Sequence, residues 1–223
     1  LLPIDYRALR LEKAKKKIEK IEELMINNIL YYLKTGIFIN NKPSYYMDAY
    51  TIVQALVDEG DFMSNELLTY HNKVIKNYIL ECKKELNCEN NQNLIDKFLL
   101  HTEHINFLIF WMSMIFRYMD RFFTITKTKR TLAKHSMDLY KSIFFEAFKK
   151  DIFIEVDKLI NEERNSFGTN ESKAKIKSVI KILKEMNFLK PKIMSERKKI
   201  FWINESHYES LSEFEINNLW INE

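Results

Sequence analysis

Glycine and proline are scarce in this chain, with 3 of each among 223 residues. A fold made of many short β-strands needs Gly, Pro and Asn-Gly turns at close intervals along the sequence. Long α-helices do not need such residues. The composition therefore predicts an all-α protein, and the chain is long enough to bury a sizeable core in one or two domains.

Apolar residues recur three and four positions apart along most of the chain, which is the spacing of one face of a helix. This pattern predicts helices over 11–35, 44–58, from Ser64 to the Asn-rich run "NCENNQN", 93–123, 132–164 and 171–187, with one more beginning in the tail 200–223. We expect Gly36 to end the first helix, Ser44 and Ser64 to be N-caps, and a bend near residue 150. Long helices with short polar loops indicate an elongated helical bundle.

The charge and hydropathy patterns disfavour a nucleic-acid or membrane protein. The net charge is +4, and the densest basic run, "KAKKK" at 13–17, is followed at once by the acidic "IEKIEE". That arrangement is typical of a solvated helix face. The richest apolar segment, 105–116, has 12 residues and fits a buried core helix better than a membrane span. The first residues lack the features of a secretory signal.

Few residues are arranged for catalysis or metal binding. Cys82 and Cys88 are six positions apart in a helical pattern, so they point to different sides of a helix, and we expect reduced intracellular thiols. The run "HTEH" places His101 and His104 three residues apart around Glu103. No second pair of ligands accompanies them, so core histidines are expected rather than a metal site. The sequence predicts no catalytic residues, no cofactor and no metal.

The segment "SYYMDAYTIVQALVDEG" at 44–60 has more apolar surface than a one-sided helix needs. At 100° per residue its apolar side chains cover an arc of roughly 160°, against roughly 100° for an ordinary surface helix. Two rows share this arc, and their members are Tyr45, Ala49, Ile52 and Leu56 in one row, and Tyr46, Tyr50, Val53 and Val57 in the other. The periodicity establishes that this helix has excess apolar surface, but it does not show what covers that surface.

Four segments resemble the N-terminal domain of cullins, in the order and at the separations found in that family. "YYMDAYTIVQAL" (45–56) resembles the second helix of cullins, and "RYMDRFFTI" (117–125) resembles their Tyr-Leu/Met-Asn/Asp-Arg-aromatic-aromatic-Val motif. "FFEAFKKDIF" (144–153) occupies the place of Leu-x-x-Trp-Arg-Asp-x-x-Phe, with Phe148-Lys149-Lys150 in place of Trp-Arg-Asp. "VDKLINEERNSFG" (156–168) is similar to the Leu-Ile-x-x-Glu-Arg-x-Gly-Glu segment.

The resemblance implies a fold of cullin-repeat type. Residues 1–165 would form the first five-helix repeat and residues 166–223 the start of the second. The chain would be the front part of a longer protein that is cytoplasmic and nuclear. It would be a non-catalytic scaffold of a ubiquitin ligase, whose C-terminal part recruits a RING subunit.

The resemblance also implies a docking site for a substrate-receptor module. The Tyr46-Met47 pair is more similar to cullins that use Skp-type adaptors with F-box proteins than to those that use BTB adaptors. The contact positions implied on the second helix are Tyr46, Met47, Tyr50 and Gln54. On the fifth helix they are Tyr140 or Lys141, since the register is uncertain by one residue, with Phe144 one turn later. Tyr46, Met47 and Tyr50 would then face outward, with Tyr45, Ala49, Ile52 and Leu56 in the core.

Two other functions compete with the cullin hypothesis. A helical tethering or solenoid protein of another family would share the composition and the long helices. A metal-dependent enzyme would be built on His101, Glu103 and His104, and would require a stoichiometric ion.

Overall fold

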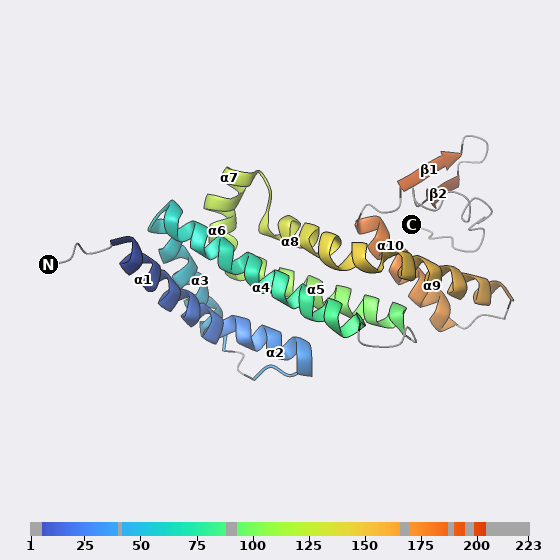
Figure 1. The fold of residues 1–223 in the computed structure, drawn as a ribbon, viewed down its shortest axis with the longest axis horizontal. Coiled ribbons are helices and arrows are strands. Elements are labelled where there is room, and N and C mark those ends of the chain that lie inside the picture. The colour runs from blue at the N-terminus through green and yellow to red at the C-terminus, as the bar shows by residue number, and fades with distance from the viewer. Residues whose placement is uncertain are drawn as a thin grey trace. The chain divides into compact units, whose positions relative to one another are not determined.

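The computed structural model describes residues 6–39, 42–87, 93–165, 170–186, 190–194 and 199–203, and almost all of them are helical. The helices are α1 (Tyr6–Ile21), α2 (Asn27–Thr35), α3 (Pro43–Asp58), α4 (Asp61–Asn87), α5 (Leu94–Ile115), α6 (Arg117–Met119), α7 (Ile125–Thr128), α8 (Leu132–Tyr140), α9 (Glu146–Asn165) and α10 (Asn170–Glu185). Short π-helical turns join some of them: η1 (Glu22–Ile26), η2 (Asp120–Thr124) and η3 (Lys141–Phe145). The expected all-α class is confirmed (Figure 1).

The chain divides into two units by its internal contacts. Unit 1 comprises Leu1–Asn90 and Leu100–Ala147, and unit 2 comprises Asn91–Leu99 and Phe148–Glu223. The repeat boundary expected after residue 165 stays a prediction.

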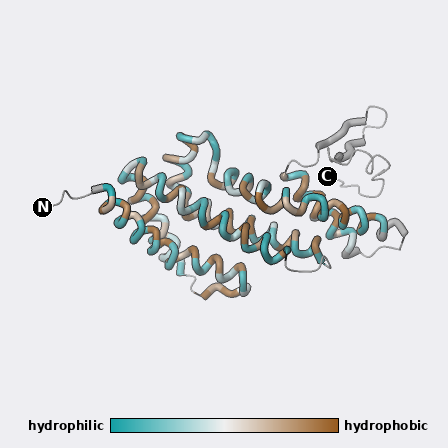
Figure 2. The backbone as a smooth tube through the Cα atoms, viewed as in Figure 1, coloured by the Kyte–Doolittle hydropathy of each residue, from teal (hydrophilic) through white to brown (hydrophobic). Residues whose placement is uncertain are grey.

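Helix α4 is the central element of unit 1. It contacts α1, α3, α8, η2 and η3 (Figure 1). Its buried apolar side chains recur at helical spacing, as Met63, Leu67, Ile75, Tyr78, Ile79, Cys82 and Leu86. Along the helices of the unit, hydrophobic and hydrophilic stretches recur with the period of a helical turn (Figure 2). This pattern is expected of amphipathic helices packed around a shared core.

The helix ends agree only partly with the predicted capping residues. Gly36 ends α2 in the left-handed region at φ 73°, and its N–H donates to the carbonyl of Tyr32 at 2.7 Å, as expected. Ser44 is not an N-cap, because α3 begins one residue earlier at Pro43, whose fixed φ suits the first turn. Ser64 lies inside α4, and its hydroxyl donates to the carbonyl of Gly60 at 3.2 Å.

The predicted helix over 93–123 is interrupted near its C-terminal end. Helix α5 ends at Ile115, and Phe116 adopts φ −92° and ψ 14°, outside the helical region. The chain continues through α6, η2 and α7 to Thr128. The π-helical turn η2 accommodates one extra residue, so Phe123 faces the core and the neighbouring Phe122 is 53% exposed.

The predicted helix over 132–164 is also irregular, but not at the expected place. Thr131 caps α8, because its hydroxyl accepts from the N–H of Lys134 at 3.2 Å. The irregularity is the π-helical turn η3 at 141–145 rather than a bend near 150. A π-helical turn shifts the residues that follow it by one position. The one-residue ambiguity in the family register on this helix lies at the same place.

Unit 2 contains α10 and a β-hairpin. Helix α10 lies within two residues of the predicted range 171–187 and buries Ile176, Val179 and Leu183, and Met186 directly after it is also buried. The strands β1 (Lys190–Met194) and β2 (Lys199–Ile203) pair antiparallel, with Lys190 opposite Ile203. Strand β2 replaces the first residues of the helix expected over 200–223, and the rest of that segment lies outside the described residues.

No helix in the described ranges is long and apolar enough to cross a membrane. Half of the residues in the segment 105–116 are buried, and Asn106 and Phe110 within it are exposed.

Glu59 connects the end of α3 to α1. Its Oε1 lies 2.6 Å from the Nζ of Lys17 and 3.1 Å from the Nζ of Lys13. The Arg10 guanidinium also donates to its backbone carbonyl at 3.3 Å. The hydrogen bond to Lys17 is the main reason that the pKa of Glu59 lies below its ordinary value of 4.5.

Glu59→Gln should lower the free energy of unfolding at pH 7 by about 1 kcal/mol or less, because these ion pairs are only partly shielded from water. Since the carboxyl pKa is lower in the folded state, the stabilisation is complete above pH 4.5 and is lost as the pH falls through the folded-state pKa. Urea unfolding at a series of pH values should therefore show the two proteins converging in acid. Glu12→Gln, which removes an exposed ion pair with Lys16, is the matched control and should have a smaller effect. A difference in unfolding free energy between Glu59→Gln and the unaltered protein that persists at pH values well below the folded-state pKa of Glu59 would contradict this account.

Candidate functional site

The orientation of α3 is fixed by a stripe of small and branched side chains. Ala49, Val53 and Leu56 are fully buried. Tyr45 and Ile52, expected in the core, are only half-buried, and Val53 joins the core from the other row. At 100° per residue, the buried stripe is centred between Val53 and Leu56.

The tyrosines predicted to face outward lie at the edge of this buried stripe. Tyr46 and Tyr50 are half-buried, and the Tyr46 hydroxyl donates to the carbonyl of Met114 at 3.3 Å. Met47 lies farther around the helix and is 55% exposed. Gln54 is half-buried. The second-helix positions therefore lie together on one side of α3 and are not enclosed in the core.

Side chains of α6 and η2 continue this surface. The ring centroids of Tyr46 and Tyr50 are 6.3 Å apart, those of Tyr50 and Tyr118 are 6.4 Å apart, and those of Tyr118 and Phe122 are 4.5 Å apart. Tyr50 and Tyr118 meet edge to face, a favourable arrangement for aromatic pairs. We call these four side chains the aromatic row.

A pocket of about 300 Å³ opens along the aromatic row. Its lining comes from α3, α6 and η2, and consists of Tyr46, Met47, Tyr50, Arg117, Tyr118, Arg121 and Phe122. We call these seven residues the aromatic surface. Exposed aromatic side chains on rigid helices, next to arginines, are typical of protein–protein hot spots.

Two aspartates hold α6 and η2 in place. The Tyr118 hydroxyl donates to Oδ1 of Asp58 at 2.9 Å, which joins α6 to the end of α3 and raises the pKa of the tyrosine. The N–H of Leu132 donates to Oδ1 of Asp120 at 2.9 Å, which joins η2 to the start of α8. Burial raises the pKa of Asp120, and this hydrogen bond partly opposes that shift.

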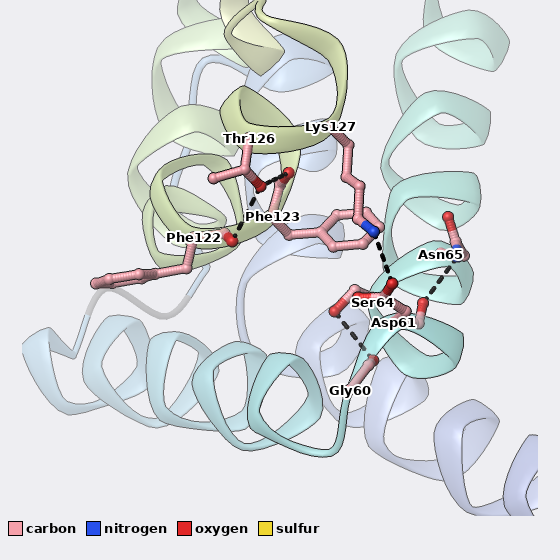
Figure 3. A network of polar contacts seen from close by, with 8 residues as sticks. All are labelled: Gly60, Asp61, Ser64, Asn65, Phe122, Phe123, Thr126 and Lys127. Atoms are coloured by element: carbon pink, nitrogen blue, oxygen red, sulfur yellow. Dashed lines mark hydrogen bonds and ion pairs between the residues drawn. The ribbon is translucent and has the colours of Figure 1, made fainter.

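A third connection joins α7 to the first turn of α4. The Nζ of Lys127 lies 2.7 Å from Oδ2 of Asp61, and the Thr126 hydroxyl donates to the carbonyl of Phe123 at 2.7 Å. Figure 3 shows the ring of Phe123 directed toward this ion pair and the ring of Phe122 directed away from it. The neighbouring rings of η2 therefore face different surroundings, one the core and the other the aromatic surface.

The fifth-helix positions implied by the resemblance are not on this surface. Tyr140 is 1% exposed and Phe144 is 0% exposed, and their rings stack with centroids 5.1 Å apart. The Tyr140 hydroxyl is 2.7 Å from the hydroxyl of Thr102. Lys141 is half-buried at the start of η3 and does not line the pocket. Tyr140 and Phe144 belong to the core of unit 1 and are not accessible to a docking partner in this structure.

The histidines of "HTEH" do not lie in a metal-ligating arrangement. His101 is buried against Phe144, the Nδ1 of His104 is 3.2 Å from the Tyr78 hydroxyl, and Glu103 is exposed. Within the described ranges no group of three or more His, Cys, Asp or Glu side chains could hold a metal ion.

The described cysteine is a buried thiol. Cys82 is unpaired, and burial raises its pKa to about 12, which disfavours the reactive thiolate. Cys88 lies outside the described residues. Burial likewise lowers the pKa of His71 to about 4, so this side chain is a neutral core histidine at pH 7.

The sequence contained a signal for the residues of α6 and η2 that was not used for the site. "RYMDRFFTI" places arginines and aromatic residues four positions apart, at 117 and 121 and at 118 and 122. Side chains four positions apart share a helix face. The spacing alone does not predict the π-helical turn η2, which places Phe122 on this face and Phe123 in the core.

Phe144→Ala should lower the free energy of unfolding by about 3–5 kcal/mol, because a buried ring is replaced by a cavity. Tyr140→Phe should cost about 1 kcal/mol, since the Thr102 hydroxyl loses this hydrogen bond. Phe122→Ala, which removes an exposed ring, should cost less than about 1 kcal/mol. Urea unfolding followed by circular dichroism measures all three. Equal losses for Phe144→Ala and Phe122→Ala would show that the two rings are not divided between core and surface.

Comparison with known proteins identifies the fold family. A family model described as the cullin alpha solenoid domain matches residues 19–213, which is most of the chain. Comparison with curated proteins finds no match. The cullin domain is a scaffold fold, and its match removes the alternative of a helical tether from an unrelated family. With long amphipathic helices in the described residues and a family model spanning nearly its full length, this chain belongs to the cullin family.

Proposed function

We propose that this chain is the N-terminal scaffold segment of a cullin-RING ubiquitin ligase, and that its aromatic surface docks a Skp-type adaptor carrying an F-box substrate receptor. The observation that carries the proposal is the position of Tyr46, Met47 and Tyr50. The resemblance implies that these are adaptor contacts, and they line one pocket with Tyr118 and Phe122. A BTB-type adaptor is the competing partner.

The chemistry of the surface suits protein docking better than catalysis. Its side chains carry aromatic, thioether and guanidinium groups. This set of residues does not place a nucleophile next to a general base, as covalent catalysis requires. Large rings with two rotatable bonds lose little conformational entropy when they are covered, so they make efficient anchors.

In this proposal the mechanism is geometric. The helical scaffold holds the substrate receptor, while a RING subunit bound to another part of the full protein brings the ubiquitin-loaded conjugating enzyme. Holding the two at a fixed separation raises the effective concentration of substrate at the conjugating enzyme. Helices without internal Gly and Pro lack two of the common causes of kinks, which suits such a scaffold. We expect the assembly to act in the cytoplasm and nucleus.

Tyr46→Ala combined with Met47→Ala should abolish co-purification with a Skp-type adaptor from the source organism. Truncation of an anchor of this kind usually costs about 2 kcal/mol or more of binding free energy. The circular dichroism spectrum should keep its helical form, since neither side chain is in the core. Tyr31→Ala with Leu80→Ala removes a tyrosine and an apolar side chain that are also exposed in unit 1 but do not line the pocket, and it should leave binding intact. Unchanged adaptor binding by the Tyr46/Met47 variant would refute the site, and capture of a BTB protein instead would refute the Skp-type partner.

Tyr118→Ala should weaken adaptor binding, and Lys141→Ala should not. The physical reason is that Tyr118 joins the two halves of the aromatic row, whereas Lys141 lies outside the pocket. Binding of both variants to the adaptor can be measured by calorimetry. If Lys141→Ala weakened adaptor binding and Tyr118→Ala did not, the result would support the fifth-helix contacts implied by the resemblance.

A further inference from the structure

Two arginines lie side by side on the aromatic surface. Arg117 belongs to α6 and Arg121 to η2, about one helical turn later, and both are exposed and line the pocket. The guanidinium carbon of Arg121 lies 5.3 Å from the centre of the Phe122 ring. This contact holds the guanidinium over an aromatic face at the edge of the pocket.

Neither arginine forms an ion pair within the described residues, in contrast to two nearby basic side chains of α7 and the loop after it. Lys127 pairs with Asp61, and Arg130 pairs with Asp138. Two like charges one turn apart on a helix repel each other. The aromatic surface therefore contains positive charge that this part of the chain does not neutralise.

The acidic side chains of η2 and of the packed helix α3 are engaged elsewhere or face away. Asp58 accepts from the Tyr118 hydroxyl, and Asp120 accepts from the N–H of Leu132. Asp48 lies about 160° around α3 from Tyr50, at 100° per residue. A carboxylate from outside the described chain would complement Arg117 and Arg121 without displacing any contact that the structure contains.

We propose that the docking partner inserts an acidic side chain, Asp or Glu, between Arg117 and Arg121, with a neighbouring apolar side chain in the pocket. The proposal rests on the proposed function for the identity of the partner, the Skp-type adaptor with its F-box protein. The planar guanidinium fork suits a carboxylate, and its charge-assisted hydrogen bonds are stronger than those between neutral groups.

This pair of arginines supplies specificity as well as attraction. An adaptor with a lysine or arginine at the facing position meets two positive charges and is rejected. An adaptor with an uncharged side chain there keeps the aromatic contacts but loses the carboxylate. The aromatic row and the two arginines therefore make separable contributions to binding.

The test measures binding of the adaptor/F-box pair to the whole chain by calorimetry. Arg117→Gln with Arg121→Gln should weaken binding by at least about tenfold. Raising the salt concentration from about 0.05 to 0.5 M should weaken binding of the unaltered chain more than that of the variant. The matched control is Arg130→Gln with Lys134→Gln, which also removes two positive charges but leaves the aromatic surface intact, and it should bind nearly as the unaltered chain does. The thermal unfolding midpoint of the free Arg117/Arg121 variant should not fall, since repulsion is removed.

Charge reversal identifies the facing carboxylate. Arg117→Glu with Arg121→Glu should abolish binding, and one Asp→Lys or Glu→Lys substitution on the adaptor should restore it. Failure of every such adaptor variant to restore binding overturns the proposal. If the Gln variant binds as tightly as the unaltered chain while Tyr46→Ala with Met47→Ala does not bind, the acidic contact is refuted and the proposed function stands. If neither variant loses binding, both are refuted.

Discussion

The packing of Ala49, Val53 and Leu56 into the core of unit 1 is the constraint on which the candidate site depends. These side chains fix the rotation of α3, which contacts α1, α4, α6 and η1. Once the rotation is set, the 100° step between residues decides every other position. Tyr46 and Tyr50 come to the edge of the buried stripe, where both are half-buried. Met47 is turned farther toward solvent.

The π-helical turn η2 has a comparable effect on the other half of the aromatic surface. Phe122 and Phe123 are adjacent and chemically identical, so hydropathy cannot decide which of them is buried. In an uninterrupted α-helix, Phe122 and Phe123 would lie three and four positions after Met119, and either ring could share the buried face of Met119. The extra residue in the turn selects Phe123 for the core and leaves Phe122 beside Tyr118. This choice depends on tertiary contacts such as the ion pair of Lys127 with Asp61, which couples residues 66 positions apart.

Much of the fold was predictable because helix formation is governed by local periodicity and by the scarcity of Gly and Pro. The outward position of Met47 was implied by the family resemblance, because periodicity established only the excess of apolar surface on this helix. The sequence could not show whether Tyr140 and Phe144 lie in a docking site or in the core. Aromatic residues recur at the same intervals along a helix whether the face that they form is buried or exposed. What separates them is a neighbour across the core, here Thr102 on α5. Hairpin β1–β2 was not predicted because its strands are short, and the helix expected in the tail rested on aromatic and acidic composition, which does not distinguish a strand from a helix.

The aromatic surface is a product of tertiary structure and not of one helix. Its seven residues come from α3, α6 and η2, and the hydrogen bond between Tyr118 and Asp58 ties two of these elements together. A partner that covers the surface therefore contacts both halves at once, and its affinity depends on their relative placement. Residues that touch no partner then influence docking by holding η2 in position, such as Asp120 of η2, which accepts from the N–H of Leu132 at the start of α8. For a scaffold this coupling is useful, because a partner bound through several elements is held in one orientation, whereas a partner bound through a single helix could pivot about it.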